Sequence, residues 1–185
     1  MILGLDISTS ITGYTILDLD GSLIELSHIE LYKIKDGIWA KVDAMKAFIK
    51  ELNSKHKITH VFIEEPLSKF SRGKSSSATI SLLMRFNGII SYLIHQEMGL
   101  DPGYYPPSRA RKMCGLTMLS KTAAKKCGQK WMPQKEQAFV QMCSRKPFID
   151  YEWPKKRTGR LKDYCYDQMD SFVIAQAGFV EHFTI

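Results

Sequence analysis

The chain opens with Met1-Ile2-Leu3-Gly4-Leu5-Asp6-Ile7-Ser8, and this stretch predicts how the rest is organised. Its aliphatic side chains do not alternate with polar ones, which is typical of a central strand covered on both faces of a sheet. Asp6 is the exception, because an ionised carboxylate in an apolar strand is costly unless a cation lies beside it. No Lys or Arg precedes Lys33, so we expect a metal ion, shared with other carboxylates, to be that cation. Alternatively, Asp6 ends the strand and caps the turn into Ser8.

Length and charge limit the classes of protein to consider. With 185 residues, 44% of them hydrophobic, the chain is long enough for one well-buried domain and short for two, so residues 1–185 are predicted to form a single domain. Lys and Arg (26) outnumber Asp and Glu (19), which gives a net charge of +7. A basic protein of this kind suits a polyanionic partner, although a solvated basic surface without a ligand would give the same count.

The cysteines and the N-terminus indicate where the protein works. Four cysteines are far apart, with no C-x-x-C pair and no His at zinc-finger spacing: Cys114, Cys127, Cys143 and Cys165. They are interpreted as reduced thiols. The first strand begins without a charged leader, and no apolar run reaches the length of a membrane span. We therefore expect a soluble cytoplasmic protein with no membrane partner.

The first third of the chain predicts a meander followed by a crossover. Residues 12–19 are rich in β-formers, Asp20-Gly21 is a hairpin turn signal, and a third strand is expected over Ser22–Lys33, at the sheet edge. An amphipathic helix follows over Ile38–His56, and then a short buried strand, Thr59–Pro66. A strand, a helix and a strand in succession form a right-handed crossover, so this fourth strand should lie parallel to the first.

That placement predicts a site at one edge of the sheet. Acids at the carboxyl ends of the first and fourth strands, Asp6 and Glu64 or Glu65, would converge where open α/β sheets bind their ligands. Glu64 is favoured, because the apolar run 61–63 leads directly into it. The alternative is that both glutamates are exposed loop acids.

The segment after Glu65 is polar, basic and contains one aromatic residue. We expect it to contact a nucleic acid, with Lys69, Arg72 and Lys74 on phosphates and Phe70 stacked on an unpaired base; a plain solvated connector would have the same composition. A long helix over Ala78–Met98 follows, with an N-cap from residues 75–77. Its apolar face is wide, so it is predicted to be largely buried.

The C-terminal half contains a further pair of acids. A short strand is expected over residues 102–107, helices after Ser108 and over Pro133–Cys143, and a last helix capped by Asp163. In that last helix Asp167 and Asp170 stand at i and i+3, so both point from one face, where like charges repel. Because apolar residues continue this side toward the core, the acids should point inward. Random acids on a solvated helix are the alternative.

Four acids are therefore expected to lie close together: Asp6, Glu64, Asp167 and Asp170. Oxygen ligands without His or Cys select Mg²⁺ or Mn²⁺ over zinc. Two such ions can generate a hydroxide nucleophile and stabilise the leaving 3′-oxygen of a phosphodiester. A basic protein with this site is a candidate metal-dependent nuclease.

The order of these motifs resembles the RuvC family of Holliday junction resolvases, in the RNase H-like superfamily. The motifs are Ile2-Leu3-Gly4-Leu5-Asp6, Thr12-Gly13-Tyr14, Phe62-Ile63-Glu64 and Asp167-Gln168-Met169-Asp170-Ser171. The resemblance implies an α/β fold with a mixed five-stranded sheet, three antiparallel strands then parallel ones, flanked by helices. It also implies a homodimer that makes paired hydrolytic nicks in four-way DNA junctions, in a bacterium or a phage-infected cell.

The resemblance also implies roles for individual residues. Asp6, Glu64, Asp167 and Asp170 take the four metal-binding positions. Lys135 resembles a helix-borne lysine near the scissile phosphate, Lys112 a second DNA-contacting lysine, and Phe70 the aromatic that stacks at the junction centre. The region 114–162 is longer than in the bacterial pattern, which indicates a phage-type or otherwise divergent member.

Three other functions remain open on the sequence alone. An RNase H-like nuclease that cuts branched DNA in general, or RNA–DNA hybrids, would use the same acids. A Gly-x-Asp strand also opens the actin-like ATPases, but that fold needs two such domains and a second phosphate loop. A junction-binding protein without catalysis is the last alternative, and the complete set of acids argues against it.

Overall fold

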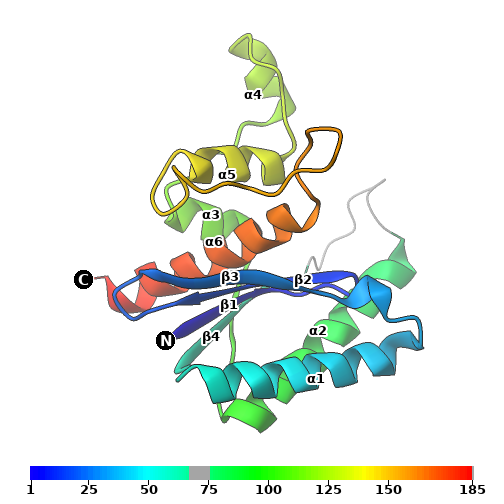
Figure 1. Ribbon diagram of the computed structural model, residues 1–185. Coiled ribbons are helices and arrows are strands. Elements are labelled where there is room, and N and C mark those ends of the chain that lie inside the picture. The colour runs from blue at the N-terminus through cyan, green and yellow to red at the C-terminus, as the bar shows by residue number, and fades with distance from the viewer. Residues whose placement is uncertain (67–75, 185) are drawn as a thin grey trace.

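The centre of the computed structural model, which describes residues 1–66 and 76–184, is a five-stranded sheet in the order β3-β2-β1-β4-β5 (Figure 1). The strands are β1 (Ile2–Asp6), β2 (Ile11–Leu17), β3 (Leu23–Glu30), β4 (His60–Glu64) and β5 (Gly103–Tyr105). β1 pairs antiparallel with β2 and parallel with β4, and β4 pairs parallel with β5. The predicted mixed sheet is confirmed, with β1 in its middle and the carboxyl ends of β1 and β4 side by side.

The hairpin between β2 and β3 forms where Asp20-Gly21 predicted it. Gly21 has a φ of +85°, which favours glycine, and its N–H donates to the carbonyl of Asp18 at 3.1 Å. β3 lies at the sheet edge as expected but ends at Glu30, and the 3₁₀ turn η1 (Leu31–Lys33) follows it. The predicted third strand was therefore three residues too long at this end.

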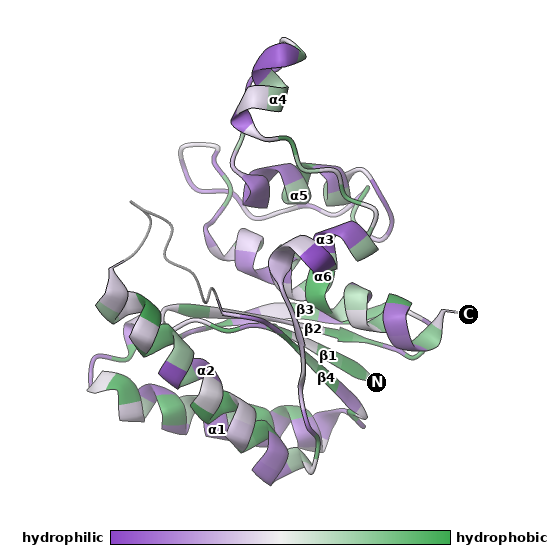
Figure 2. Ribbon diagram, turned by 180° about the vertical axis from the view of Figure 1, so that it is seen from behind, coloured by the Kyte–Doolittle hydropathy of each residue, from purple (hydrophilic) through white to green (hydrophobic). Residues whose placement is uncertain are grey.

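Helices cover both faces of the sheet (Figures 1 and 2). On one face lie α1 (Gly37–Lys55) and α2 (Ser77–Met98); on the other lies α6 (Tyr164–Phe183), with α3 (Pro107–Met113) and α5 (Gln134–Cys143) beyond it. Buried aliphatic side chains of β1 serve both layers: Leu3 and Leu5 pack toward α1 and α2, and Ile2 packs toward α6. This two-sided burial is what the apolar first strand predicted.

α2 differs from its prediction in one respect. Ser76 caps it by accepting a hydrogen bond from the Thr79 N–H, as expected. However, only its second half packs into the core, through residues such as Phe86 and Ile90, whereas Leu82 and Met84 are 38% and 46% exposed. The expectation of a largely buried helix was wrong. By length and composition α2 is also long and apolar enough to cross a membrane. A helix that contributes to the core passes the same test, so this is weak evidence for a membrane span.

α6 lies directly against β1 and β2 because two glycines leave it room. A Cβ added at Gly4 would lie 2.4 Å from the Ser171 carbonyl oxygen, and one at Gly13 would lie 2.1 Å from the Asp167 carbonyl oxygen. The hydroxyls of Thr15 and Ser171 are 2.8 Å apart and share a hydrogen bond in this interface. The first turns of α6, which contain Asp167 and Asp170, are thereby held over the end of β1.

The region 114–162 holds one helix that the sequence did not predict, α4 (Lys121–Lys126), which projects away from the body of the molecule (Figure 1). Two predicted caps are absent. α3 begins at Pro107, with Pro106 rather than Ser108 at its N-cap, and Asp163 makes no capping hydrogen bond to α6. Asp163 binds the Lys156 ammonium instead, with both oxygens at 2.8 Å.

Candidate active site

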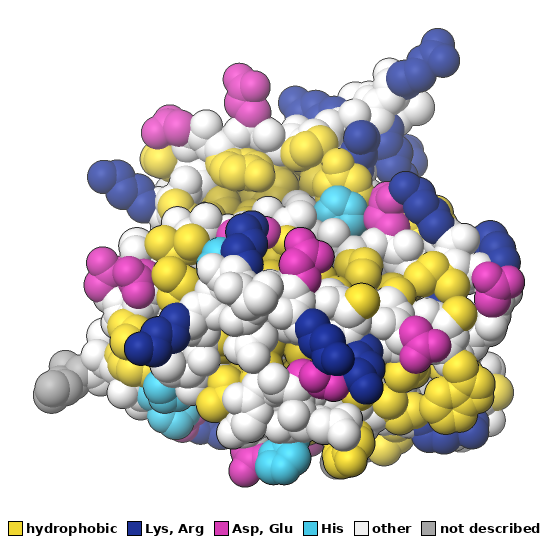
Figure 3. Space-filling model, turned by 60° about the horizontal axis from the view of Figure 1, so that its bottom comes forward, with side chains coloured by type: hydrophobic (Ala, Val, Ile, Leu, Met, Phe, Trp, Pro, Cys, Tyr) yellow, Lys and Arg dark blue, Asp and Glu magenta, His cyan; other side chains and the backbone are white. Residues whose placement is uncertain are grey.

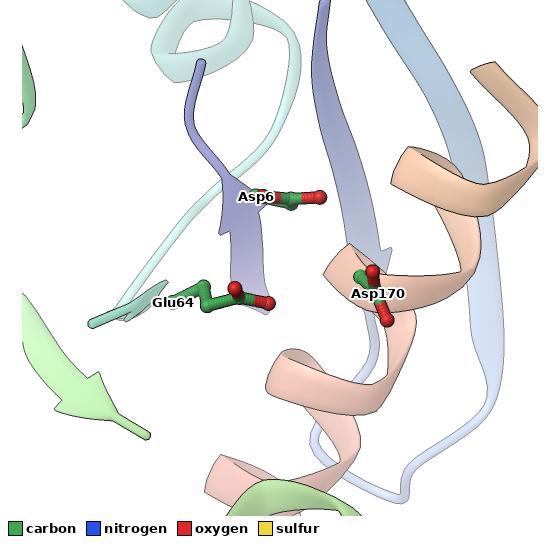
Figure 4. Close-up of side chains that lie close together, drawn as sticks. All are labelled: Asp6, Glu64 and Asp170. Carbon is green, nitrogen blue, oxygen red and sulfur yellow. The ribbon is translucent and has the colours of Figure 1, made fainter. Parts of the chain in front are cut away.

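Three of the four predicted acids meet at the edge of the sheet (Figure 4). Asp6 ends β1, Glu64 ends β4, and Asp170 points toward them from α6. Each offers a carboxylate oxygen, and these oxygens all lie within 4.8 Å of one another. Glu65 is exposed, so the choice of Glu64 over its neighbour agrees with the structure. Parallel pairing of β1 with β4 is the cause, because it brings both strand ends to one edge.

Asp167 joins the group through Lys135, which α5 places among the acids. The Lys135 ammonium donates a hydrogen bond to Oδ1 of Asp167 at 2.7 Å, and it lies 3.1 Å from Oδ2 of Asp170. It is also 3.6 Å from Oδ2 of Asp6. The expectation that a metal ion would be the cation beside Asp6 was therefore incomplete, because a lysine from far along the chain also reaches it.

Arg111 is a site residue that the sequence did not identify. It lies in α3, is only 8% exposed, and donates from an Nη atom to Oδ1 of Asp170 at 3.3 Å. Asp170 is itself 5% exposed, so the two form a buried ion pair. The only signal was the run of cations in this short helix, which does not tell the buried Arg111 from the exposed Lys112.

Burial and crowding shift the protonation of these groups. Burial raises the pKa of Asp6 to about 7, although the Lys135 ammonium beside it opposes the shift. Burial likewise raises the pKa of Glu64 well above its ordinary value, and the nearby carboxylates of Asp6 and Asp170 add to this. Burial alone would lower the pKa of Lys135, but the surrounding carboxylates raise it above its usual range. Lys135 is thus a permanent cation beside Asp6, whose raised pKa shows that burial disfavours its ionised form.

The donor set fits a divalent cation. Hard carboxylate oxygens are the ligands that Mg²⁺ and Mn²⁺ prefer, and Asp6, Glu64 and Asp170 present them at close range. A bound cation would also offset the burial that raises the pKa of Asp6 and Glu64, because positive charge favours the ionised carboxylate. The Lys135 ammonium supplies part of this charge, so an entering ion would compete with it.

The acids open into a cavity of about 690 Å³, within the range of roughly 300 to 1,000 Å³ that is usual for ligand sites. One wall carries Asp6, Glu64, Asp170, Arg111 and Lys135. The lining also includes Lys121 and Trp131, from the segment around α4. The site is therefore a cleft between the sheet edge and the region 114–162.

Solved structures resemble the chain over nearly its whole length. RuvC of Thermus thermophilus in complex with a Holliday junction substrate has a TM-score of 0.63 at 14% identity, covering 99% of this chain and 95% of that one. The chain has the fold of the RuvC resolvases. A second structure of Thermus thermophilus RuvC gives a TM-score of 0.61 at 14% identity, with 96% and 93% covered. The yeast mitochondrial Holliday junction resolvase gives 0.53 at 15% identity, with 98% and 80% covered.

This likeness confirms the RuvC-type, RNase H-like fold that the order of motifs predicted. No protein-family model matches the sequence, and no curated protein sequence matches it. The likeness is one of fold.

Of the residues predicted to contact DNA, the structure describes only Lys112 and Lys135. Lys69, Phe70, Arg72 and Lys74 lie outside the described residues, so their predicted role stays a prediction. Lys112 is exposed on α3, beside the buried Arg111. Lys135 lies in the acid cluster itself, and the cavity wall adds Lys121, which the sequence did not single out as a site residue.

Proposed function

We propose that the chain is a metal-dependent endonuclease that resolves four-way DNA junctions. The observation that carries this proposal is the convergence of Asp6, Glu64 and Asp170 around Lys135, in a cleft of a RuvC-type fold. Buried carboxylates gain little from meeting one another, because each raises the pKa of the next. Their convergence makes sense as a cation site at the carboxyl edge of the sheet.

In this proposal Asp6, Glu64 and Asp170 would hold two Mg²⁺ or Mn²⁺ ions, and Asp167 would be the fourth metal-binding acid. When bound, such ions activate water and stabilise negative charge on the phosphate and on the leaving 3′-oxygen. Lys135 is half-exposed, and its ammonium can turn from Asp167 to a phosphate oxygen, where it stabilises the charge that develops during hydrolysis. The products are a 5′-phosphate and a 3′-hydroxyl.

Arg111 acts on the protein side of the site. Its guanidinium pairs with the buried carboxylate of Asp170 and holds that carboxylate in one orientation. Lys135 does the same for Asp167 until a substrate arrives. Asp6 and Glu64 also face the cleft, and burial raises the pKa of both.

The charge of the chain supports a nucleic-acid substrate. No acidic residue occurs between Asp101 and Glu136, a stretch that contains α3 and α4 and reaches the cleft. Its cations are Arg109, Arg111, Lys112, Lys121, Lys125, Lys126, Lys130 and Lys135. Apart from the buried Arg111 and the half-buried Lys135, these cations are exposed, and a basic surface beside the acids attracts a polyanion. Branched DNA is such a polyanion, and it occurs in the cytoplasm of a bacterium or a phage-infected cell, where we propose that the enzyme works.

We extend the proposal to a homodimer, because two equivalent sites suit a junction with approximate two-fold symmetry. The first half of α2 is the candidate interface, since Leu82 and Met84 are exposed there, and Tyr92 is 61% exposed in its second half. Figure 3 views the side of the molecule on which α1 and α2 lie, where hydrophobic side chains are interspersed with charged ones. Interfaces commonly combine apolar anchors with such a polar rim.

Incubation with a mobile four-way junction in Mg²⁺ tests the reaction, and mapping the nicks tests whether they are paired and symmetric. Linear duplex, a three-way fork and an RNA–DNA hybrid are the comparison substrates. Faster cutting of the four-way junction supports a resolvase. Equal cutting of linear duplex or hybrid would point to an RNase H-like nuclease of broader specificity.

Sedimentation at micromolar concentration tests the dimer, with Met84→Asp as the interface variant. We expect a dimer for the unchanged protein and a shift toward monomer for the variant, because the substitution places a charge in an apolar contact. Lys57→Asp, at an exposed position between α1 and β4, is the control. A strict monomer with unpaired nicks would contradict this part of the proposal.

A further inference from the structure

One wall of the acid cavity is formed by a hairpin-like segment, residues 119–133, which contains α4. The residues of this segment that line the cavity include no carboxylate that could bind a metal ion: Leu119, Ser120, Lys121, Trp131 and Pro133. They face the same cavity as Asp6, Glu64 and Asp170. A nucleic-acid strand that fills this cavity from the acids outward would meet this wall as well.

The wall is fixed to the helix that carries Lys135. In α5, the Gln137 side chain accepts from the Leu119 N–H at 2.7 Å and donates to the carbonyls of Leu119 at 3.0 Å and Met132 at 2.7 Å. It thus ties both ends of the segment to α5. The Trp131 indole N–H donates to the Leu119 carbonyl at 3.2 Å, which sets the orientation of the ring. These hydrogen bonds consequently fix the position of the Trp131 ring relative to α5, the helix that carries Lys135.

A cation lies over this ring. The Lys121 ammonium is 4.7 Å from the centroid of the Trp131 ring, within cation–π distance. Lys121 is exposed and Trp131 is half-buried, so the ammonium can leave the ring at the cost of a weak contact. An aromatic face and a mobile cation side by side are the two elements with which proteins bind a nucleotide of a single strand, by stacking and by phosphate contact.

We propose that Trp131 and Lys121 form a nucleotide subsite that binds the nucleotide next to the scissile phosphate. The base of this nucleotide would stack on the indole, and its other phosphate, the one away from the cleavage point, would contact Lys121. The inference rests on the nuclease function proposed above and identifies residues with which that site binds the strand it cuts. A nucleic acid is the occupant that fits, because the surrounding stretch contains no acid between Asp101 and Glu136. The base must be unpaired or displaced, since a paired base offers no free face.

Variants of Trp131 test the stacking. Trp131→Ala should raise the KM for junction cleavage about 5- to 150-fold, the range expected for one stacked base, with a smaller change in kcat. Trp131→Phe keeps a stacking ring and loses the bond to Leu119, so it should recover most of the affinity. Trp39→Ala removes a tryptophan that is 68% exposed on α1 and is the matched control. If Trp131→Phe behaves like Trp131→Ala, the ring only anchors the wall and the subsite is wrong.

Abasic substrates give the sharper test. Abasic sites are placed at each position flanking the cleavage point, and binding is measured in Ca²⁺ to prevent turnover. At one position the abasic substitution should weaken binding of the unchanged protein, but weaken Trp131→Ala no further, because both changes remove the same contact. Additive losses at every position would overturn the subsite while junction cleavage by the unchanged protein left the proposed function intact. If the unchanged protein neither binds nor cuts branched DNA, both proposals fail.

Discussion

The Lys135 ammonium lies 2.7 Å from Oδ1 of Asp167 and also reaches Oδ2 of Asp170 at 3.1 Å, so one lysine from α5 contacts both acids of α6. A permanent cation therefore lies within the cluster of acids. In the proposed reaction the same cation would face the phosphate, which gives Lys135 two opposed effects. It assists the chemistry, and it competes with the metal ion for the carboxylates.

Replacing this cation tests both effects. Lys135→Met should lower the single-turnover cleavage rate about 100-fold, because one stabilising donor is lost. It should also tighten Mn²⁺ binding about 10-fold, because a positive charge at about 4 Å from the ligands no longer opposes the ion. Calorimetric titration with Mn²⁺ measures the affinity, and quenched-flow cleavage measures the rate. Lys57→Met is the control, and weaker Mn²⁺ binding in Lys135→Met would contradict the competition.

Asp170→Asn separates catalysis from DNA binding. We expect a loss of about 1,000-fold in cleavage with nearly unchanged junction affinity, because the acids hold metal while the basic surface holds DNA. This variant should also lose about 3 kcal/mol of folding free energy, since the buried Arg111 is left without its charged partner. Gel shift in Ca²⁺ and urea denaturation measure the two quantities. Junction binding that disappears together with cleavage would overturn this division of labour.

Asp6→Asn should have the opposite effect on stability when metal is absent. Burial raises the pKa of Asp6 from 3.8 to about 7, so between these values the folded protein keeps a proton that the unfolded chain has lost. The free energy of unfolding therefore decreases as pH rises through this window, because the folded protein must ionise a buried carboxyl. Asparagine does not ionise, so the variant avoids this loss. We expect a gain of about 4 kcal/mol at pH 8 and less than half of that at pH 5.

Thermal denaturation in a chelator at both pH values measures this difference. Asp36→Asn, an exposed acid at the start of α1, is the matched control and should show no pH-dependent gain. An equal gain from Asp6→Asn at pH 5 and pH 8 would mean that charge burial is not its cause. The variant should still be inactive, so stability and activity would change in opposite directions.

Much of this arrangement could be predicted because its causes are local. The apolar run into Asp6, the apolar run into Glu64 and the crossover between them determine that both acids meet at one edge. The i and i+3 spacing of Asp167 and Asp170 likewise puts them on one face of α6. These features depend on strand and helix periods, which a sequence displays directly.

The rest could not be predicted because it depends on contacts between distant segments. Arg111 and Lys112 are neighbours with similar charge, and only the packing of α3 on α6 decides that Arg111 is buried. α4 is six residues long, too short to show a helical period. The apolar residues at the start of α2 predicted burial, but periodicity does not say whether the covering surface belongs to the same chain.

Gly13 provides the last test, because it links the fold to the position of Asp167. A Cβ at this position would lie 2.1 Å from the Asp167 carbonyl oxygen and 2.4 Å from its carbonyl carbon, both in the backbone of α6. Gly13→Ala must therefore push the first turn of α6 away from β2. We expect a loss of about 3 kcal/mol in folding free energy and a cleavage defect that persists where the variant is fully folded.

Gly88→Ala is the matched control for this substitution. Gly88 lies within α2, and an added Cβ would meet nothing within 4 Å, so alanine should stabilise the protein by about 1 kcal/mol through its higher helix propensity. Urea denaturation compares the two variants, and cleavage is measured at a temperature where both are folded. Full activity in folded Gly13→Ala would mean that Asp167 need not be held against the sheet, and its place among the metal-binding acids would then be wrong.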